Sequence, residues 1–141
     1  MKILLSIKPE FASRIFDGSK KYEYRRAIFK RREVESIIVY ASNPIRRVIG
    51  EFDIGEILHE EPELLWIQTC SHAGITKARF IEYFRNQPKG YAIGIRRVRK
   101  YQTPLLLADL KLPLPPQSFK YLYTDTTGHF YNIGKHSLSE S

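Results

Sequence analysis

Hydrophobic and polar residues alternate along several short stretches of the chain. Residues 2–8 alternate weakly, whereas the run Ile37-Ile38-Val39-Tyr40 is continuously apolar, as in a strand that is buried on both faces. Further alternation surrounds Val48 and follows Gly90. The pattern predicts strands over residues 2–8, 21–26, 35–40, 48–54 and 90–100.

Three other stretches place apolar residues at helical spacing. The first begins at Pro9, which suits the first turn of a helix, and ends at Gly18, which can adopt the left-handed conformation that closes many helices. The second covers residues 62–72. The third covers residues 76–86, with Thr76 as the expected N-cap.

The order of these elements indicates an α+β fold. It lacks the repeated strand–helix–strand rhythm of a doubly wound parallel sheet. Gly50 within the 48–54 region and Gly55 directly after it predict bulges or tight bends of a closed sheet. The Pro-rich and aromatic stretch 104–134 predicts one or two edge strands. We therefore expect a single domain over residues 1–141, a small mixed β-barrel flanked by about three short helices.

Composition narrows the class of protein. A hydrophobic content of 43% supports a packed core, and no apolar run approaches the roughly 20 residues needed to cross a bilayer, so we expect a soluble chain without membrane contact. The only cysteine, Cys70, excludes an internal disulfide and favours a cytoplasmic location. Cys70 and His72 are too few for a zinc site, and nucleotide-binding glycine motifs are missing, so we predict no metal and no cofactor.

Charge gives the first indication of function. The net charge is +8, and residues 1–50 hold 12 Lys or Arg against 5 Asp or Glu. Clustered cations bind polyanions because they displace counterions from phosphates, although many basic proteins bind no nucleic acid. The cations gather in four clusters, at Arg25-Arg26, Lys30-Arg31-Arg32, Arg46-Arg47 and Arg96-Arg97-Arg99-Lys100.

The junction between the first helix and the second strand carries the candidate chemistry. It reads Gly18-Ser19-Lys20-Lys21-Tyr22-Glu23-Tyr24-Arg25. Glu23 and Arg25 are two residues apart and therefore project from one face of a strand, close to Lys20. The carboxylate would orient a cation, and the remaining donors would face a phosphate, a carbonyl or a base edge. The alternative is an exposed ladder of ion pairs, which contributes about 0–1 kcal/mol.

The spacing G-x-K-x-x-E-x-R at Gly18, Lys20, Glu23 and Arg25 resembles the signature of the ASCH domain family. The resemblance implies a PUA-like barrel with a cleft into which the motif side chains project. It also implies RNA binding in many members, hydrolysis of acylated cytidine nucleosides in some, and ribonuclease activity in others. In the nucleoside hydrolases the position of Glu23 is a threonine that attacks an acyl carbon, so this chain departs from that branch.

The primary hypothesis is a domain that binds RNA or a nucleotide, preferably single-stranded, without catalysis. The alternative is a small metal-independent hydrolase, either a ribonuclease or an acylated-cytidine amidohydrolase, in which Lys20 stabilises an oxyanion and Glu23 acts as general base. A third is a regulatory protein-interaction module. The residues expected to bind the ligand are Gly18, Lys20, Glu23, Arg25, Arg26, Arg31 and Arg32, together with Ser118 and Phe119 near the C-terminus.

Overall fold

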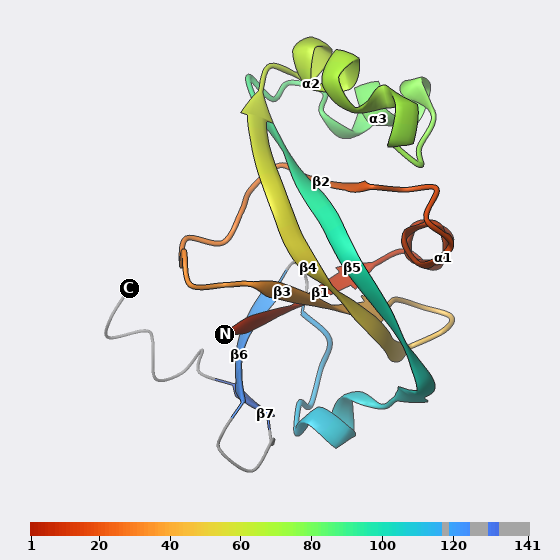
Figure 1. The fold of residues 1–141 in the computed structure, drawn as a ribbon, viewed down its shortest axis with the longest axis vertical. Helices are drawn as coiled ribbons and strands as arrows, with labels where there is room; N and C mark the ends of the chain where they lie inside the picture. Colours follow the sequence, from red (N-terminus) through yellow and green to blue (C-terminus); the bar gives the residue numbers. More distant parts are fainter. Residues whose placement is uncertain (117–118, 125–129, 133–141) are drawn as a thin grey trace.

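A computed structural model describes residues 1–116, 119–124 and 130–132 (Figure 1). Seven strands form one mixed sheet in the order β2-β5-β4-β3-β1-β6-β7. β1 lies parallel to β3 and antiparallel to β6, and the other neighbours are antiparallel. The strands are β1 (Lys2–Ile7), β2 (Tyr22–Arg25), β3 (Ser36–Ala41), β4 (Arg47–Glu60), β5 (Gly90–Leu105), β6 (Phe119–Thr124) and β7 (Phe130–Asn132).

The helices begin and end close to the positions that the sequence predicts. They are α1 (Pro9–Asp17), α2 (Pro62–Thr69) and α3 (Lys77–Tyr83), and two 3₁₀ turns cover Cys70–His72 and Leu107–Leu110. Gly18 closes α1 in the left-handed conformation with φ 88°, and the Thr76 hydroxyl accepts a hydrogen bond from the Arg79 amide at the start of α3. No helix in the described part of the chain is long and apolar enough to cross a membrane.

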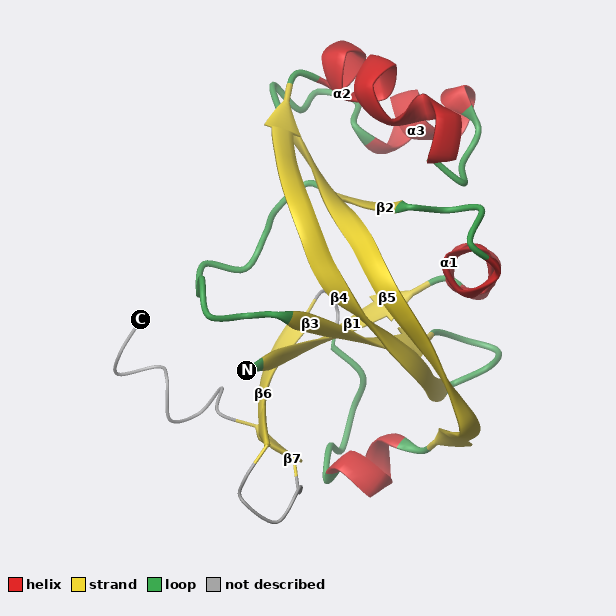
Figure 2. Ribbon diagram, viewed as in Figure 1, coloured by secondary structure: helices red, strands yellow, loops and turns green. Residues whose placement is uncertain are grey.

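The α+β class is confirmed, whereas closure of the sheet into a barrel stays a prediction. β2 and β7 end the hydrogen-bonded order, and no pairing between them is found among the described residues. Of the strands in the final stretch, β7 is an edge strand, but β6 is an interior strand between β1 and β7. β4 and β5 are longer than predicted, and Figure 2 shows them running from the helical pair α2–α3 to the 3₁₀ turn at the opposite end.

The two long strands bend at bulges. Their register shifts between Val48 and Gly50 and again between Ile54 and Ile57, which confirms the bulges predicted at Gly50 and Gly55. Gly50 is required by close packing, because a Cβ there would lie 2.6 Å from the Arg99 carbonyl oxygen. The bent pair of strands contributes to three clusters of the core, with Phe52 in the first, Val48 in the second and Ala92 in the third.

The part of the core that supports the site lies between β2 and α3. Tyr24 of β2 packs edge-on against Phe80 of α3 and against Phe84, the residue that follows α3, with ring centroids 5.0 and 6.2 Å apart. The Tyr24 hydroxyl lies 2.6 Å from the hydroxyl of Thr69, which in turn donates to the Leu65 carbonyl. This packing fixes β2 against the helical pair, so the motif residues on β2 have a rigid support.

Candidate functional site

The turn after α1 directs the Lys20 side chain into the protein. The Lys20 amide donates to the Arg14 carbonyl at 2.9 Å, and the next amide, of Lys21, donates to the His72 carbonyl at 2.9 Å. These two bonds connect the turn to α1 on one side and to the 70–72 turn on the other. Lys21 is exposed as a result, whereas only 2% of the Lys20 surface is accessible to solvent.

The Lys20 ammonium is almost completely desolvated. Its Nζ donates to the Ala73 carbonyl oxygen at 2.8 Å and lies 4.7 Å from the Tyr24 ring centroid and 5.3 Å from that of Phe11. Burial disfavours the charged form and lowers the pKa of Lys20 to about 8, although the nearby Glu23 carboxylate opposes this shift. Both protonation states of Lys20 are therefore accessible close to neutral pH.

Glu23 and Arg25 form an ion pair beside Lys20. As predicted from their spacing, they share a face of β2, and Arg25 Nη2 lies 3.0 Å from Glu23 Oε2. Arg25 Nη2 also donates to the Ser6 carbonyl oxygen at 2.9 Å, while its Nε is the only buried side-chain donor without a partner among the described residues. The guanidinium thus retains unused donor capacity next to the buried lysine.

These side chains line a hollow of about 520 Å³, a size suited to a nucleotide. β2 contributes one wall, α1 contributes Phe11, and α3 contributes Arg79 and Tyr83. Figure 1 shows α1 beside the start of β2 and α3 above it. Arg26 lies over the Tyr83 ring at 4.5 Å, so an aromatic surface and a cation meet at the rim. We call this hollow the motif cleft.

The motif cleft brings together four of the nine predicted ligand-binding residues, namely Lys20, Glu23, Arg25 and Arg26. Gly18 does not line it and acts through the backbone, because its left-handed conformation ends α1 at the point where the chain must turn.

The remaining predicted residues lie elsewhere. Arg31 lies 5.6 Å over the Tyr121 ring and 3.5 Å from the Glu33 carboxylate, and Arg32 lines a separate hollow. The Phe119 ring is half-buried against the core and packs edge-on against the neighbouring rings of Phe29 and Tyr121, so it lies in the core and not in the motif cleft. Ser118 lies outside the described residues.

Phe11, Arg79 and Tyr83 are among the residues of the motif cleft that were not predicted from the sequence. Phe11 lies on the first helix, where its spacing suggests only core packing, and Arg79 and Tyr83 lie about sixty residues beyond the motif. Arg79 bridges the two helices by pairing with Glu10 at 2.9 Å and lying 4.8 Å over the Phe11 ring. The sequence signal that could have identified Arg79 and Tyr83 together is their helical spacing, since residues four apart in α3 share a face.

Nowhere in residues 1–116, 119–124 and 130–132 do three or more His, Cys, Asp or Glu side chains gather in a way that would hold a metal ion. What the motif cleft offers is the desolvated Lys20 ammonium, the Glu23 carboxylate and three guanidinium groups, those of Arg25, Arg26 and Arg79. This arrangement can bind a phosphodiester and stabilise negative charge that develops on it.

Comparison with known proteins reveals clear similarities. The model of the ASCH domain family matches residues 5–106. ATP synthase subunit alpha of Ureaplasma parvum serovar 3 is 29% identical over 121 residues, which are 85% of this chain but only 15% of that relative. An ASCH domain-containing ribonuclease of Zymomonas mobilis subsp. mobilis is 30% identical over 128 residues, 88% of this chain and 86% of the relative.

The crystal structure of an ASCH protein from Zymomonas mobilis superposes with a TM-score of 0.81 at 29% identity and covers 89% of this chain and 90% of that one. Similarity therefore extends over nearly the whole length of both chains in the Zymomonas comparisons, whereas it covers a small part of the Ureaplasma relative.

Proposed function

The chain belongs to the ASCH domain family, and from this membership we propose that it is a ribonuclease that cleaves single-stranded RNA in the motif cleft. The observation that carries the proposal is the buried Lys20 ammonium, whose pKa is lowered to about 8 beside a carboxylate and a guanidinium. The name of the Zymomonas ribonuclease supports RNA as the substrate. This reverses our primary hypothesis from the sequence, which was binding without catalysis.

The proposed reaction is an attack of a ribose 2′-hydroxyl on its adjacent phosphate. The 2′-oxygen forms a bond to phosphorus, its proton passes to the Glu23 carboxylate, and the bond from phosphorus to the 5′-oxygen breaks. Lys20 gives a proton to the departing 5′-oxygen and stabilises the negative charge of the transition state. Arg25, which is paired with Glu23 and lines the motif cleft, provides positive charge for the phosphate. The products are a 2′,3′-cyclic phosphate and a 5′-hydroxyl.

The protonation state of Lys20 supports this role. An acid catalyst works best when its pKa lies near the working pH, because it is then charged in a large fraction of molecules and still releases its proton readily. A solvent-exposed lysine would hold its proton too tightly. The desolvated position between the Tyr24 and Phe11 rings brings the pKa of Lys20 to about 8.

Acyl transfer from a nucleoside has less support. Glu23 stands where the resemblance places a threonine nucleophile. Ser19 is exposed and does not line the motif cleft, and the hydroxyl of Ser6, which does line it, donates to the Pro116 carbonyl at 2.7 Å. We therefore expect no hydrolysis of acetylated cytidine.

The proposal is tested by time courses of RNA cleavage with Lys20→Ala, Lys20→Arg, Glu23→Gln and, as a matched control, Lys21→Ala. Lys21 is the exposed neighbour, so its loss removes the same charge from outside the motif cleft. Both Lys20 variants should lose cleavage at least 100-fold, because arginine is not deprotonated near neutral pH. Glu23→Gln should also lose cleavage, because an amide cannot accept the proton of the 2′-hydroxyl.

Binding measurements separate catalysis from binding. Fluorescence anisotropy with a non-cleavable 2′-O-methyl RNA should give similar affinities for the wild type and Lys20→Arg, since the charge is retained. An absence of RNA cleavage by the wild type, together with tight binding, would overturn the ribonuclease and restore the binding domain as the primary hypothesis.

A further inference from the structure

A second hollow of about 500 Å³ lies on another part of the surface. It is formed by β4, β5 and the end of the connection between β2 and β3. Its cationic residues are Arg32, Arg96 and Arg97, and its acidic residues are Glu35 and Asp53. We call it the arginine hollow. None of its lining residues belongs to the motif cleft.

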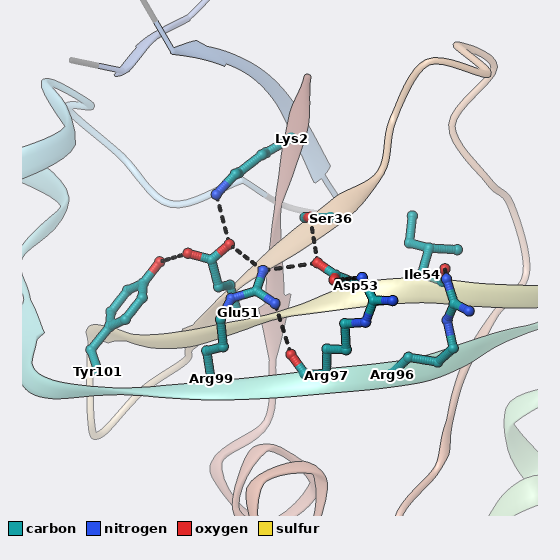
Figure 3. Close-up of polar contacts among 9 residues, drawn as sticks. All are labelled: Lys2, Ser36, Glu51, Asp53, Ile54, Arg96, Arg97, Arg99 and Tyr101. Carbon is teal, nitrogen blue, oxygen red and sulfur yellow. Dashed lines mark hydrogen bonds and ion pairs between the residues drawn. The ribbon is translucent and has the colours of Figure 1, made fainter. Parts of the chain in front are cut away.

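A strained backbone in β5 brings several arginines to the side of the sheet that carries the arginine hollow. Side chains alternate between the two faces of a regular strand, so Arg96 and Arg97 would project in opposite directions. The register of β4 and β5 shifts between Glu51 and Asp53, and Arg97 adopts a left-handed conformation with φ 49°. Such a conformation is strained for any residue other than glycine. Figure 3 shows the result, in which Arg96, Arg97 and Arg99 all reach the same side of the sheet.

Asp53, an acidic residue that lines the arginine hollow, already accepts hydrogen bonds from two side chains. Asp53 accepts hydrogen bonds of 2.8 Å from Arg99 and 2.8 Å from the Ser36 hydroxyl (Figure 3). Arg97 lies farther from the same carboxylate, at 3.6 Å, and 74% of its side chain is exposed. The Asp53 charge is therefore matched chiefly by Arg99, which leaves Arg97 available to another anion.

The other two arginines are also weakly engaged. Arg96 donates a single long bond of 3.3 Å to the Ile54 carbonyl. Arg32 is exposed and, within the described part of the chain, has no side-chain hydrogen bond or ion pair. Three guanidinium groups with spare donors on one concave surface match the geometry of phosphate oxygens. Of the two carboxylates that line the arginine hollow, Asp53 is bound by Arg99 and Glu35 is not.

Chain connectivity places this hollow within reach of the motif cleft. Arg26 lines the motif cleft and Arg32 lines the arginine hollow, so their Cα atoms are at most about 21 Å apart even if residues 26–32 are fully extended. Single-strand binding folds accommodate about 4–16 nucleotides, a length that can cover such a distance.

We propose that the arginine hollow binds the phosphates of an RNA strand that extends from the motif cleft along residues 26–32. This inference rests on the proposed function, since it concerns the same substrate, but it assigns a second site that acts only on longer strands. The proposal also explains the strained backbone at Arg97. This backbone conformation places more guanidinium groups on one face of the sheet than a regular strand would.

The test compares two double variants that each remove two arginine charges. Arg32→Gln with Arg97→Asn removes charge from the arginine hollow, and asparagine tolerates the left-handed backbone. The matched control is Arg46→Asn with Arg47→Gln, because Arg46 is also exposed and left-handed, with φ 53°, and lines neither hollow. Anisotropy is measured with a 12-nucleotide and a dinucleotide probe of single-stranded 2′-O-methyl RNA over a series of salt concentrations.

The Arg32/Arg97 variant should bind the 12-nucleotide probe about 10-fold more weakly than the wild type. For this variant the slope of log affinity against log salt concentration should be shallower by about 1.4, because each lost phosphate contact contributes roughly 0.7 to that slope. The loss should be confined to the longer probe and absent from the control. The second site would be overturned if the two double variants weakened RNA binding equally. It would also be overturned if the Arg32/Arg97 variant lost as much affinity for the dinucleotide as for the 12-nucleotide probe. A wild type that binds neither probe would overturn the proposed function itself.

Discussion

Replacing Lys20 with methionine should stabilise the protein while it removes catalysis. Lowering the pKa of Lys20 from 10.5 to about 8 corresponds to roughly 3 kcal/mol of destabilisation at neutral pH, because the folded protein binds the proton less tightly than the unfolded chain. Methionine retains the length of the side chain without the charge. The Ala73 carbonyl then loses its donor, at a cost of roughly 1–2 kcal/mol.

The net expectation is a gain of about 1 kcal/mol in the free energy of unfolding of Lys20→Met at pH 7, or roughly 3 °C in Tm. The pH dependence gives a sharper test. The wild type should gain about 2 kcal/mol between pH 7 and pH 9.5, because the penalty declines as pH rises from about 8 toward 10.5. Lys20→Met should lack this rise.

Urea unfolding at both pH values measures the effect, with Lys21→Met as the control for loss of an exposed positive charge. The control should follow the wild type at each pH. The reasoning would be refuted if Lys20→Met were less stable than the wild type at pH 7 and both proteins had the same dependence on pH. In that case the ammonium would stabilise the fold, and the buried lysine would be structural.

Two further substitutions test the packing around Lys20 and the hydrogen bonds of Asp53 in the arginine hollow. Gly74→Ala should destabilise the protein by about 2 kcal/mol in urea unfolding, because φ of Gly74 is 64° and a Cβ there would collide with the Lys20 side chain. RNA cleavage should fall as well. A variant as stable as the wild type would contradict this packing. Hydrogen bonds from Arg99 and Ser36 lower the pKa of Asp53 to about 2, so the stability that it contributes above its ordinary pKa of 3.8 is lost as pH falls through about 2. Asp53→Asn should flatten that acid limb in urea titrations, and an unchanged limb would contradict the assignment.

Local rules predicted the elements and the motif. Pro9, Gly18 and Thr76 mark helix ends through backbone geometry and capping, which depend only on neighbouring residues. The two-residue spacing of Glu23 and Arg25 was sufficient to place them on one face of a strand, where the structure shows an ion pair of 3.0 Å. These features required no knowledge of the tertiary fold.

Long-range packing accounts for what the sequence did not reveal. The burial of Lys20 depends on the Ala73 carbonyl, more than fifty residues away, and the Arg79 contribution depends on how α3 docks beside α1. The arginine clusters of the sequence also do not show how their members are shared out, because Arg25 and Arg26 line one hollow while Arg32 joins Arg97 in another.

The pairing of β1 has a consequence for anyone who expresses part of this chain. β1 lies between β3 and β6, and its residues Lys2–Leu5 pair with residues 119–122. The family match ends at residue 106, before β6 begins. A fragment cut at that boundary would leave the outer backbone amides and carbonyls of β1 unpaired along a largely apolar strand. Such an edge is a template for strand addition by a second copy, so the shorter fragment should aggregate where the longer chain does not.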